Sequence, residues 1–130
     1  MPTVYAETLP TASLGRVRFG FDVSGHLVEV KMRADTRSGS RGNAPKGVPS
    51  RIKLEKWLAA YMKGRQVAFP GKWQMPGNSD FARDVYAAVA ALKPGETLSY
   101  GGVAERAGSA KAYRAVGTAM GKNPLPLVVP

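Results

Sequence analysis

The chain has 130 residues, enough for one domain of typical size or for two small lobes. It carries 19 Lys and Arg against 9 Asp and Glu, a formal net charge of +10, and it contains no cysteine. These residues therefore exclude a disulfide, a cysteine-ligated zinc or iron–sulfur site, and a thiolate nucleophile. The single histidine, His26, leaves little room for histidine-based catalysis, so we expect no metal and no cofactor.

The positive charge favours a polyanion as partner, because clustered Lys and Arg release condensed counterions from phosphates. A ribosome-associated protein with a solvated basic surface has the same composition. No apolar run approaches the roughly 20 residues that cross a bilayer, and the start of the chain lacks the pattern of a signal peptide. We expect a cytoplasmic or nucleoid-associated protein, nuclear if the source is a eukaryote, with no membrane partner.

The amino-terminal segment has the alternating pattern of β-strands. Short β-rich runs cover residues 4–6, 14–21 and 26–30, separated by Pro10–Ser13 and by a turn at Ser24-Gly25. This pattern predicts a small antiparallel meander. Three short strands need a helix across one face to be stable.

Residues 50–62 are predicted to form that covering helix, and Gly64 ends it. Apolar residues recur there at spacings of three and four: Ile52, Leu54, Trp57, Leu58, Tyr61 and Met62. We assign Trp57 and Trp73 to packing in the core and between lobes rather than to base stacking. His26, on the predicted third strand, is assigned a half-exposed structural position.

Between the sheet and this helix, residues 33–50 are rich in Arg, Lys, Gly and Ser and predict a long mobile basic loop. Arg37, Arg41 and Lys46 would reach phosphate there, or the loop is a solvated linker. We place an α+β lobe in residues 1–75 and a second, helical lobe in residues 76–130.

The second lobe begins with a helix capped by Asn78 or Ser79 and ended by Pro94-Gly95. Its apolar face is formed by Phe81, Val85, Val89 and Leu92. Two shorter helices, 99–107 and 110–120, follow on either side of a Gly108-Ser109 break. This is the outline of a helix-turn-helix, although many helical hairpins share it.

The sequence from Phe81 onward also resembles the DNA-binding lobe of the O6-alkylguanine-DNA alkyltransferases, or methylated-DNA–protein-cysteine methyltransferases. The resemblance is carried by residues 85–92, 94–101, 103–104, 108, 114–117, 119–120 and 123–126. The strand-rich start and residues 54–64 match that family more loosely. The resemblance implies an α+β fold: a three-stranded antiparallel sheet with a covering helix, then a winged-helix-like lobe with a helix-turn-helix.

In that family the helix-turn-helix enters the minor groove of duplex DNA and flips an O6-alkylguanine into a pocket. Tyr100 matches the tyrosine that crowds the 3′ phosphate, and Arg114 matches the arginine finger that fills the vacated stack. Asn123 and Pro124 match the hinge leading to the pocket strand, here 125–129. The DNA-binding positions that the resemblance implies are Tyr100, Gly101, Ser109, Ala110, Lys111, Arg114, Ala115, Gly117 and Lys122.

The implied roles agree with elementary chemistry. Extruding a base costs a few kcal/mol of stacking and pairing, and a flat guanidinium such as that of Arg114 can occupy the gap. Small residues give the helix a slim profile suited to a groove about 6 Å wide, or else to close helix packing. They are Ala110, Ala112, Ala115, Gly117 and Ala119. Without the resemblance, we would assign Arg114 to a solvated basic helix surface. A core position for Tyr100 would then be as good an assignment as a DNA contact.

The resemblance stops at Pro130, the proline that opens the family's Pro-Cys-His-Arg motif. We therefore assign no catalytic residue and expect binding without alkyl transfer from this chain as written. Three explanations stay open: a fragment of a longer alkyltransferase, a truncated relative that binds without repairing, and a chain completed by a second polypeptide. We also expect residues 125–130 to expose an apolar edge that supports self-association or docking on a partner.

Overall fold

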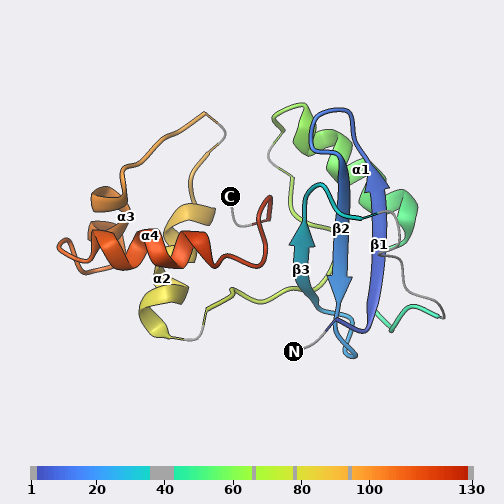
Figure 1. Cartoon of the computed structure of the whole chain (residues 1–130), viewed down its shortest axis with the longest axis horizontal. Helices are drawn as coiled ribbons and strands as arrows, with labels where there is room; N and C mark the ends of the chain where they lie inside the picture. The colour runs from blue at the N-terminus through green and yellow to red at the C-terminus, as the bar shows by residue number, and fades with distance from the viewer. Residues whose placement is uncertain (1–2, 36–42, 66, 78, 94, 129–130) are drawn as a thin grey trace. The chain divides into compact units, whose positions relative to one another are not determined.

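The computed structural model describes residues 3–35, 43–65, 67–77, 79–93 and 95–128. These residues form an α+β fold, as predicted, with three strands and four helices (Figure 1). In chain order they are β1 (Tyr5–Pro10), β2 (Arg16–Phe21), β3 (Leu27–Lys31), α1 (Arg51–Met62), α2 (Asp80–Ala90), α3 (Tyr100–Arg106) and α4 (Tyr113–Gly121). Within the described ranges, every helix is too short or too polar to cross a bilayer.

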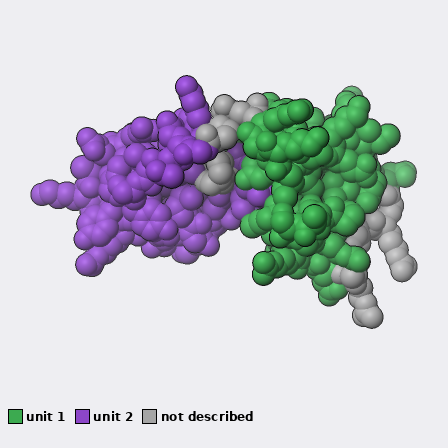
Figure 2. All heavy atoms as spheres, turned by 90° about the horizontal axis from the view of Figure 1, so that it is seen from above, with its two compact units in different colours: residues 1–74 green, residues 75–130 purple. Residues whose placement is uncertain are grey.

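The chain divides into two compact units, Met1–Gln74 (unit 1) and Met75–Pro130 (unit 2), coloured separately in Figure 2. Unit 1 holds the sheet and α1, and unit 2 holds α2, α3 and α4.

The sheet of unit 1 is an antiparallel meander in the order β1-β2-β3. Val17, Phe19 and Phe21 alternate along β2 and are fully buried, so one face of the central strand forms the core. The first strand is longer than predicted: it runs from Tyr5 to Pro10, with Pro10 opposite Arg16. Proline is tolerated there because it is the last residue of an outer strand.

A tight turn joins β2 to β3. The buried Asp22 carboxylate accepts backbone N–H bonds from Ser24 (2.9 Å) and His26 (3.0 Å), and Gly25 has φ = +83°. His26 lies in this turn rather than on the third strand, with Nδ1 3.8 Å from Asp22 Oδ1. It is half-buried, as predicted, and belongs to the turn.

Helix α1 lies along one side of the sheet (Figure 1) and contributes Leu54, Trp57 and Leu58 to the core. The Ser50 side chain caps it by accepting the Lys53 N–H at 3.3 Å, and Gly64 follows its last turn with φ = +75°.

Two residues that we predicted on the buried side of α1 are exposed, Ile52 at 64% and Met62 at 40%. They belong to the first and last turns, and each is five residues from Trp57, which at 3.6 residues per turn is about 140° around the helix. The three- and four-residue spacing therefore predicted too wide an apolar face.

An aromatic cluster completes the core of unit 1. The Phe19 ring lies 6.0 Å from Trp57 and 6.0 Å from Phe69, and Trp57 meets Phe69 edge-on at 5.2 Å between centroids. The indole N–H of Trp57 donates to the Val67 carbonyl at 3.0 Å. This placement in the core agrees with the packing role predicted for Trp57.

Part of the predicted basic loop is structured against the sheet. The chain at Lys46 passes directly over the β2–β3 turn, because a Cβ on Gly25 would collide with the Lys46 carbonyl oxygen. Pro49, just before α1, is buried. Residues 36–42, which include Arg37 and Arg41, lie outside the described residues.

Candidate nucleic-acid interface

The first helix of the predicted helix-turn-helix is α3. Its Ser99 cap accepts the Gly102 N–H at 3.0 Å, and the helix ends before Gly108, which has φ = +89°. Backbone bonds from Gly108 N–H to Glu105 O and from Ser109 N–H to Ala104 O close its last turn. The glycine break thus lies at the predicted position, because few residues other than glycine adopt this backbone conformation.

The second helix, α4, begins at Tyr113, three residues later than predicted. Residues 110–112 form a turn in which the Ala112 N–H donates to the Ser109 carbonyl at 2.9 Å. Ala112 is the N-cap residue and offers no side-chain acceptor, whereas a serine caps each of the other three helices described here. Ala110, Lys111 and Ala112 therefore lie at the entrance to the helix and not along it.

Two buried groups set the rotation of α4 about its axis. Val116 is fully buried, in a cluster with Val85, Val89, Val103 and Ala104. The Tyr86 hydroxyl, from α2, donates to the Ala119 carbonyl at 2.6 Å, and burial raises the pKa of Tyr86 above its usual value. These contacts hold one side of α4 inward and leave the opposite side to solvent.

The outward side of α4 carries exposed residues that include Arg114, Ala115 and Thr118, and the exposed Lys122 follows as its C-cap. Arg114 belongs to the first turn of α4, and its carbonyl accepts a hydrogen bond from the Thr118 hydroxyl at 3.3 Å. Its side chain reaches the preceding residue: Arg114 Cζ lies 6.0 Å from the centroid of the Tyr113 ring. Tyr113 is itself 50% exposed.

Tyr100 and α4 share this surface. Tyr100 is 55% exposed, and a Cβ on Gly117 would lie only 3.2 Å from its Cε2 atom. Gly117 thus allows the tyrosine ring of α3 to lie against α4, one helical turn from Arg114. The Tyr100 ring therefore lies against the helix that carries Arg114, although the two residues are fourteen positions apart in the sequence.

The remaining predicted contact residues are distributed around this pair. Ser109, Ala110, Lys111, Ala115 and Lys122 are exposed, and Gly101 is partly buried at the start of α3. The predicted hinge is a local turn: Asn123 Oδ1 accepts the Leu125 N–H at 2.9 Å, and Pro124 follows it.

The end of the described chain differs from the expected exposed apolar strand. Leu125 is 2% exposed and Leu127 is 9% exposed, and residues 126–128 form a turn. Leu127 has φ = +78°, which is incompatible with a strand. The expectation of a strand at 125–129 that leaves an apolar edge in solvent is therefore wrong for residues 125–128. Val129 and Pro130 lie outside the described residues.

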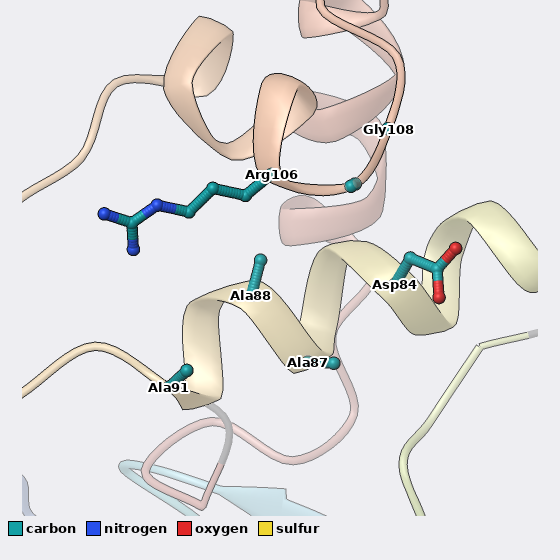
Figure 3. A pocket seen from close by; sticks show the side chains of 7 residues that line it. Asp84, Ala87, Ala88, Ala91, Arg106 and Gly108 are labelled. Atoms are coloured by element: carbon teal, nitrogen blue, oxygen red, sulfur yellow. The ribbon is translucent and has the colours of Figure 1, made fainter.

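A shallow hollow of about 530 Å³ lies elsewhere on unit 2, between α2 and the end of α3 (Figure 3). Its lining residues are Asp84, Ala87, Ala88, Ala91, Arg106, Ala107 and Gly108. It contains none of the predicted DNA-contact residues. Among the residues described, no group of three His, Asp or Glu side chains is placed to hold a metal ion.

Residues 80–130 match the family model described as the DNA-binding domain of 6-O-methylguanine DNA methyltransferase. Over 73 residues the chain is 40% identical to the methylated-DNA–protein-cysteine methyltransferase of Methanosarcina mazei and 44% identical to that of Mycolicibacterium paratuberculosis. These matches cover 56% of this chain but only 46% and 44% of those proteins, so the chain matches less than half the length of these curated relatives.

The whole fold is also similar to solved structures. The crystal structure of Mycobacterium tuberculosis OGT in complex with DNA superposes with a TM-score of 0.73 and 29% identity, covering 98% of this chain and 76% of that one. The R37K variant of the same protein gives 0.74 and 27%.

The chain therefore has a small sheet-and-helix unit followed by a helix-turn-helix unit that matches a DNA-binding domain. Residues 80–130 are thus similar to the DNA-binding domain of 6-O-methylguanine DNA methyltransferase, which confirms the resemblance found in the sequence.

The sequence pattern did not indicate two residues of unit 2, one exposed beside Arg114 and one buried behind α4. The first is Tyr113, for which an exposed aromatic next to an arginine is itself a signal. Tyr86 was not singled out because its role depends on Ala119, which lies 33 positions away.

Proposed function

We propose that this chain binds duplex DNA through the α3–α4 surface and rotates an O6-alkylated guanine out of the base stack. The proposal is supported by two exposed residues of unit 2: Tyr100, whose ring lies beside Gly117 of α4, and Arg114, one helical turn before that glycine. One relative of similar fold has been crystallised in complex with DNA, which supports DNA as the partner.

Arg114 is the residue assigned to the vacated stack. Base extrusion costs a few kcal/mol, and a planar guanidinium both stacks and donates hydrogen bonds to the orphaned base. Tyr100 beside it is placed to crowd the backbone of the rotating nucleotide. In this proposal Ala115 and Gly117 give α4 the slim side that a minor groove requires.

Phosphate contacts are assigned to the residues around this pair. Lys111 and Ser109 stand at the uncapped start of α4, and Lys122 stands at its end, all exposed. Such contacts position a protein on the duplex without reading its sequence. We expect a salt slope that corresponds to roughly 3 to 6 neutralised phosphates.

Alkyl transfer is not assigned to these residues. The 130 residues include no cysteine, and transfer needs a thiolate next to the alkyl carbon. A cysteine outside this sequence, in a longer chain or in a second one, would be required. The alternative of docking through residues 125–130 has weaker support, because Leu125 and Leu127 are buried.

Fluorescence anisotropy with duplexes that contain guanine or O6-methylguanine, measured over a salt series, tests the proposal. Arg114→Ala should weaken binding to the lesion duplex roughly ten-fold or more, as expected for loss of a base contact. Arg106→Ala is the matched control, since it removes an exposed arginine on α3 that lines the separate hollow. Binding that ignores salt, or that responds equally to both substitutions, would contradict the proposal.

Intact mass spectrometry tests the assignment of binding without transfer. After incubation with O6-methylguanine duplex, the mass of the 130-residue chain should not change. A gain of one methyl group would show that these residues hold an acceptor other than cysteine and would overturn the assignment.

A further inference from the structure

We propose that Tyr113 is a positioning residue for Arg114. Its ring holds the guanidinium on the exposed face of unit 2 in the free protein and stays in contact with it when the arginine enters the base stack. The inference rests on the proposed function of Arg114 and adds a residue that the helix-turn-helix pattern did not suggest.

The geometry of the pair is the first argument. Arg114 Cζ lies 6.0 Å from the centroid of the Tyr113 ring, within the distance at which a guanidinium is attracted to an aromatic face. Arginine has many rotamers, and docking one conformation costs side-chain entropy. A partner that already restricts the guanidinium in the free protein lowers that cost at the moment of insertion.

The exposure of Tyr113 is the second argument. Tyr113 is 50% exposed, whereas Val116, three residues further along α4, is fully buried with Val85 and Val103. Val116 thus supplies the buried contact of this turn, and half of the Tyr113 side chain is open to a ligand.

The position of Tyr113 in the helix is the third argument. Tyr113 is the first residue of α4, after a cap residue whose side chain makes no hydrogen bond. It precedes Gly117 by four residues, so the two share one side of the helix. Tyr100 lies against that same glycine, which places two tyrosines around the approach of Arg114 to DNA.

The test uses a duplex with O6-methylguanine and a neighbouring 2-aminopurine, whose fluorescence rises when stacking around the lesion is lost. Tyr113→Leu keeps apolar bulk and removes the aromatic face, and Tyr113→Phe keeps the face. We expect Tyr113→Leu to reduce lesion-duplex affinity and the equilibrium fluorescence signal by roughly two- to five-fold, the range of an exposed cation–π contact. Tyr113→Phe should stay within two-fold of the parent chain.

A double-mutant cycle with Arg114→Ala separates positioning from a structural role. In the Arg114→Ala background, Tyr113→Leu should have no further effect on the fluorescence signal, because the group it positions is gone. The salt slope should not change, since tyrosine is neutral, and the melting temperature of each variant should match the parent chain.

The outcomes distinguish the inference from the function on which it rests. If Arg114→Ala abolishes the signal but Tyr113→Leu leaves it intact, the role of Tyr113 is refuted and the proposed function stands. The same holds if Tyr113→Leu is equally harmful without Arg114, or if Tyr113→Phe fails to rescue. If the parent chain gives no signal and Arg114→Ala changes nothing, both proposals fall.

Discussion

The two units differ in what fills their cores and in how much charge they carry. Unit 1 is built around the large rings of Phe19, Trp57 and Phe69, whereas unit 2 is built around valines and an alanine. Unit 1 has 13 Lys and Arg against 5 Asp and Glu, a net charge of +8, and unit 2 has 6 against 4, a net charge of +2. The candidate DNA interface is thus on the less basic unit.

This contrast shows that net charge and binding surface are separate properties. The overall charge of +10 was the first argument for a polyanionic partner, yet most of it lies outside the helix-turn-helix. What distinguishes unit 2 is the size and placement of its side chains. A core of small residues lets three short helices approach closely, and a glycine lets Tyr100 lie beside α4.

The largest effect is expected in the aromatic core. Phe19→Ala should destabilise unit 1 by about 3–5 kcal/mol, because it leaves a cavity between Trp57 and Phe69. Both tryptophans of the chain, Trp57 and Trp73, belong to unit 1, so urea unfolding followed by tryptophan fluorescence reports on this unit. Ile52→Ala, an apolar deletion at a site that is 64% exposed, is the control and should cost less than about 0.5 kcal/mol. Equal losses would remove the distinction between core and surface in unit 1.

Removing two lysines from one unit at a time tests whether the charge of unit 1 or of unit 2 contributes to DNA binding. Lys111→Gln with Lys122→Gln should lower the salt slope of duplex binding by about 2, since each phosphate contact contributes about 0.9. Lys56→Gln with Lys63→Gln removes the same charge from the exposed side of α1 and should leave the slope nearly unchanged. Anisotropy titrations from low to physiological salt measure both. A matching decrease for the α1 pair would mean that unit 1 also contacts phosphate.

The sequence predicted elements best where a side chain marks their ends. Ser79 is one of the two caps predicted for α2, and Ser50 and Ser99, the first residues of two predicted helices, cap α1 and α3. Gly108 ends α3 as expected. The predicted start of α4 was three residues too early, because Ala110, Lys111 and Ala112 favour a helix by propensity. In the structure they form a turn closed by the bond from Ala112 N–H to the Ser109 carbonyl, and α4 begins after it.

Features that depend on distant partners were not predictable. Nothing local shows that Gly117 serves Tyr100 or that Ala119 accepts a bond from Tyr86, because both depend on how the helices pack. The composition of the segment from Leu125 is typical of a strand. The structure instead has a turn at residues 126–128, in which Leu127 has a positive φ. A pattern of apolar residues indicates burial more reliably than it indicates the element that is buried.

A smaller effect is expected from the polar contact inside unit 2. Tyr86→Phe removes the 2.6 Å bond to the Ala119 carbonyl and should destabilise unit 2 by about 1 kcal/mol. It should also loosen the last turn of α4, which can be followed by amide hydrogen exchange at Lys122, whose N–H bonds to Thr118 and Ala119. Tyr113→Phe removes the same hydroxyl from an exposed ring and should change neither. Unchanged exchange in Tyr86→Phe would show that Val116 alone fixes the helix.

The smallest effect is expected in the pH dependence of the stability of unit 1, through the carboxyl of Glu29. Burial of the Glu29 carboxyl acts to raise its pKa, but hydrogen bonds from Thr3 and Lys31 and the charges of Arg18 and Lys31 outweigh burial, so the pKa lies below its ordinary value of 4.5. The contacts are Thr3 Oγ1 at 3.0 Å, Lys31 Nζ at 3.2 Å and Arg18 Nη1 at 3.3 Å.

A carboxyl whose pKa is lowered by folding stabilises the folded state above its unfolded pKa and loses that contribution as the pH falls through the folded value. Glu29→Gln should therefore lower the melting temperature of unit 1 slightly at pH 6, and the difference from the parent chain should shrink as the pH falls below 4.5. Melting curves recorded by tryptophan fluorescence between pH 3 and 6 measure this difference in melting temperature. A difference that stays constant with pH would assign the effect of Glu29 to packing instead of to its charge.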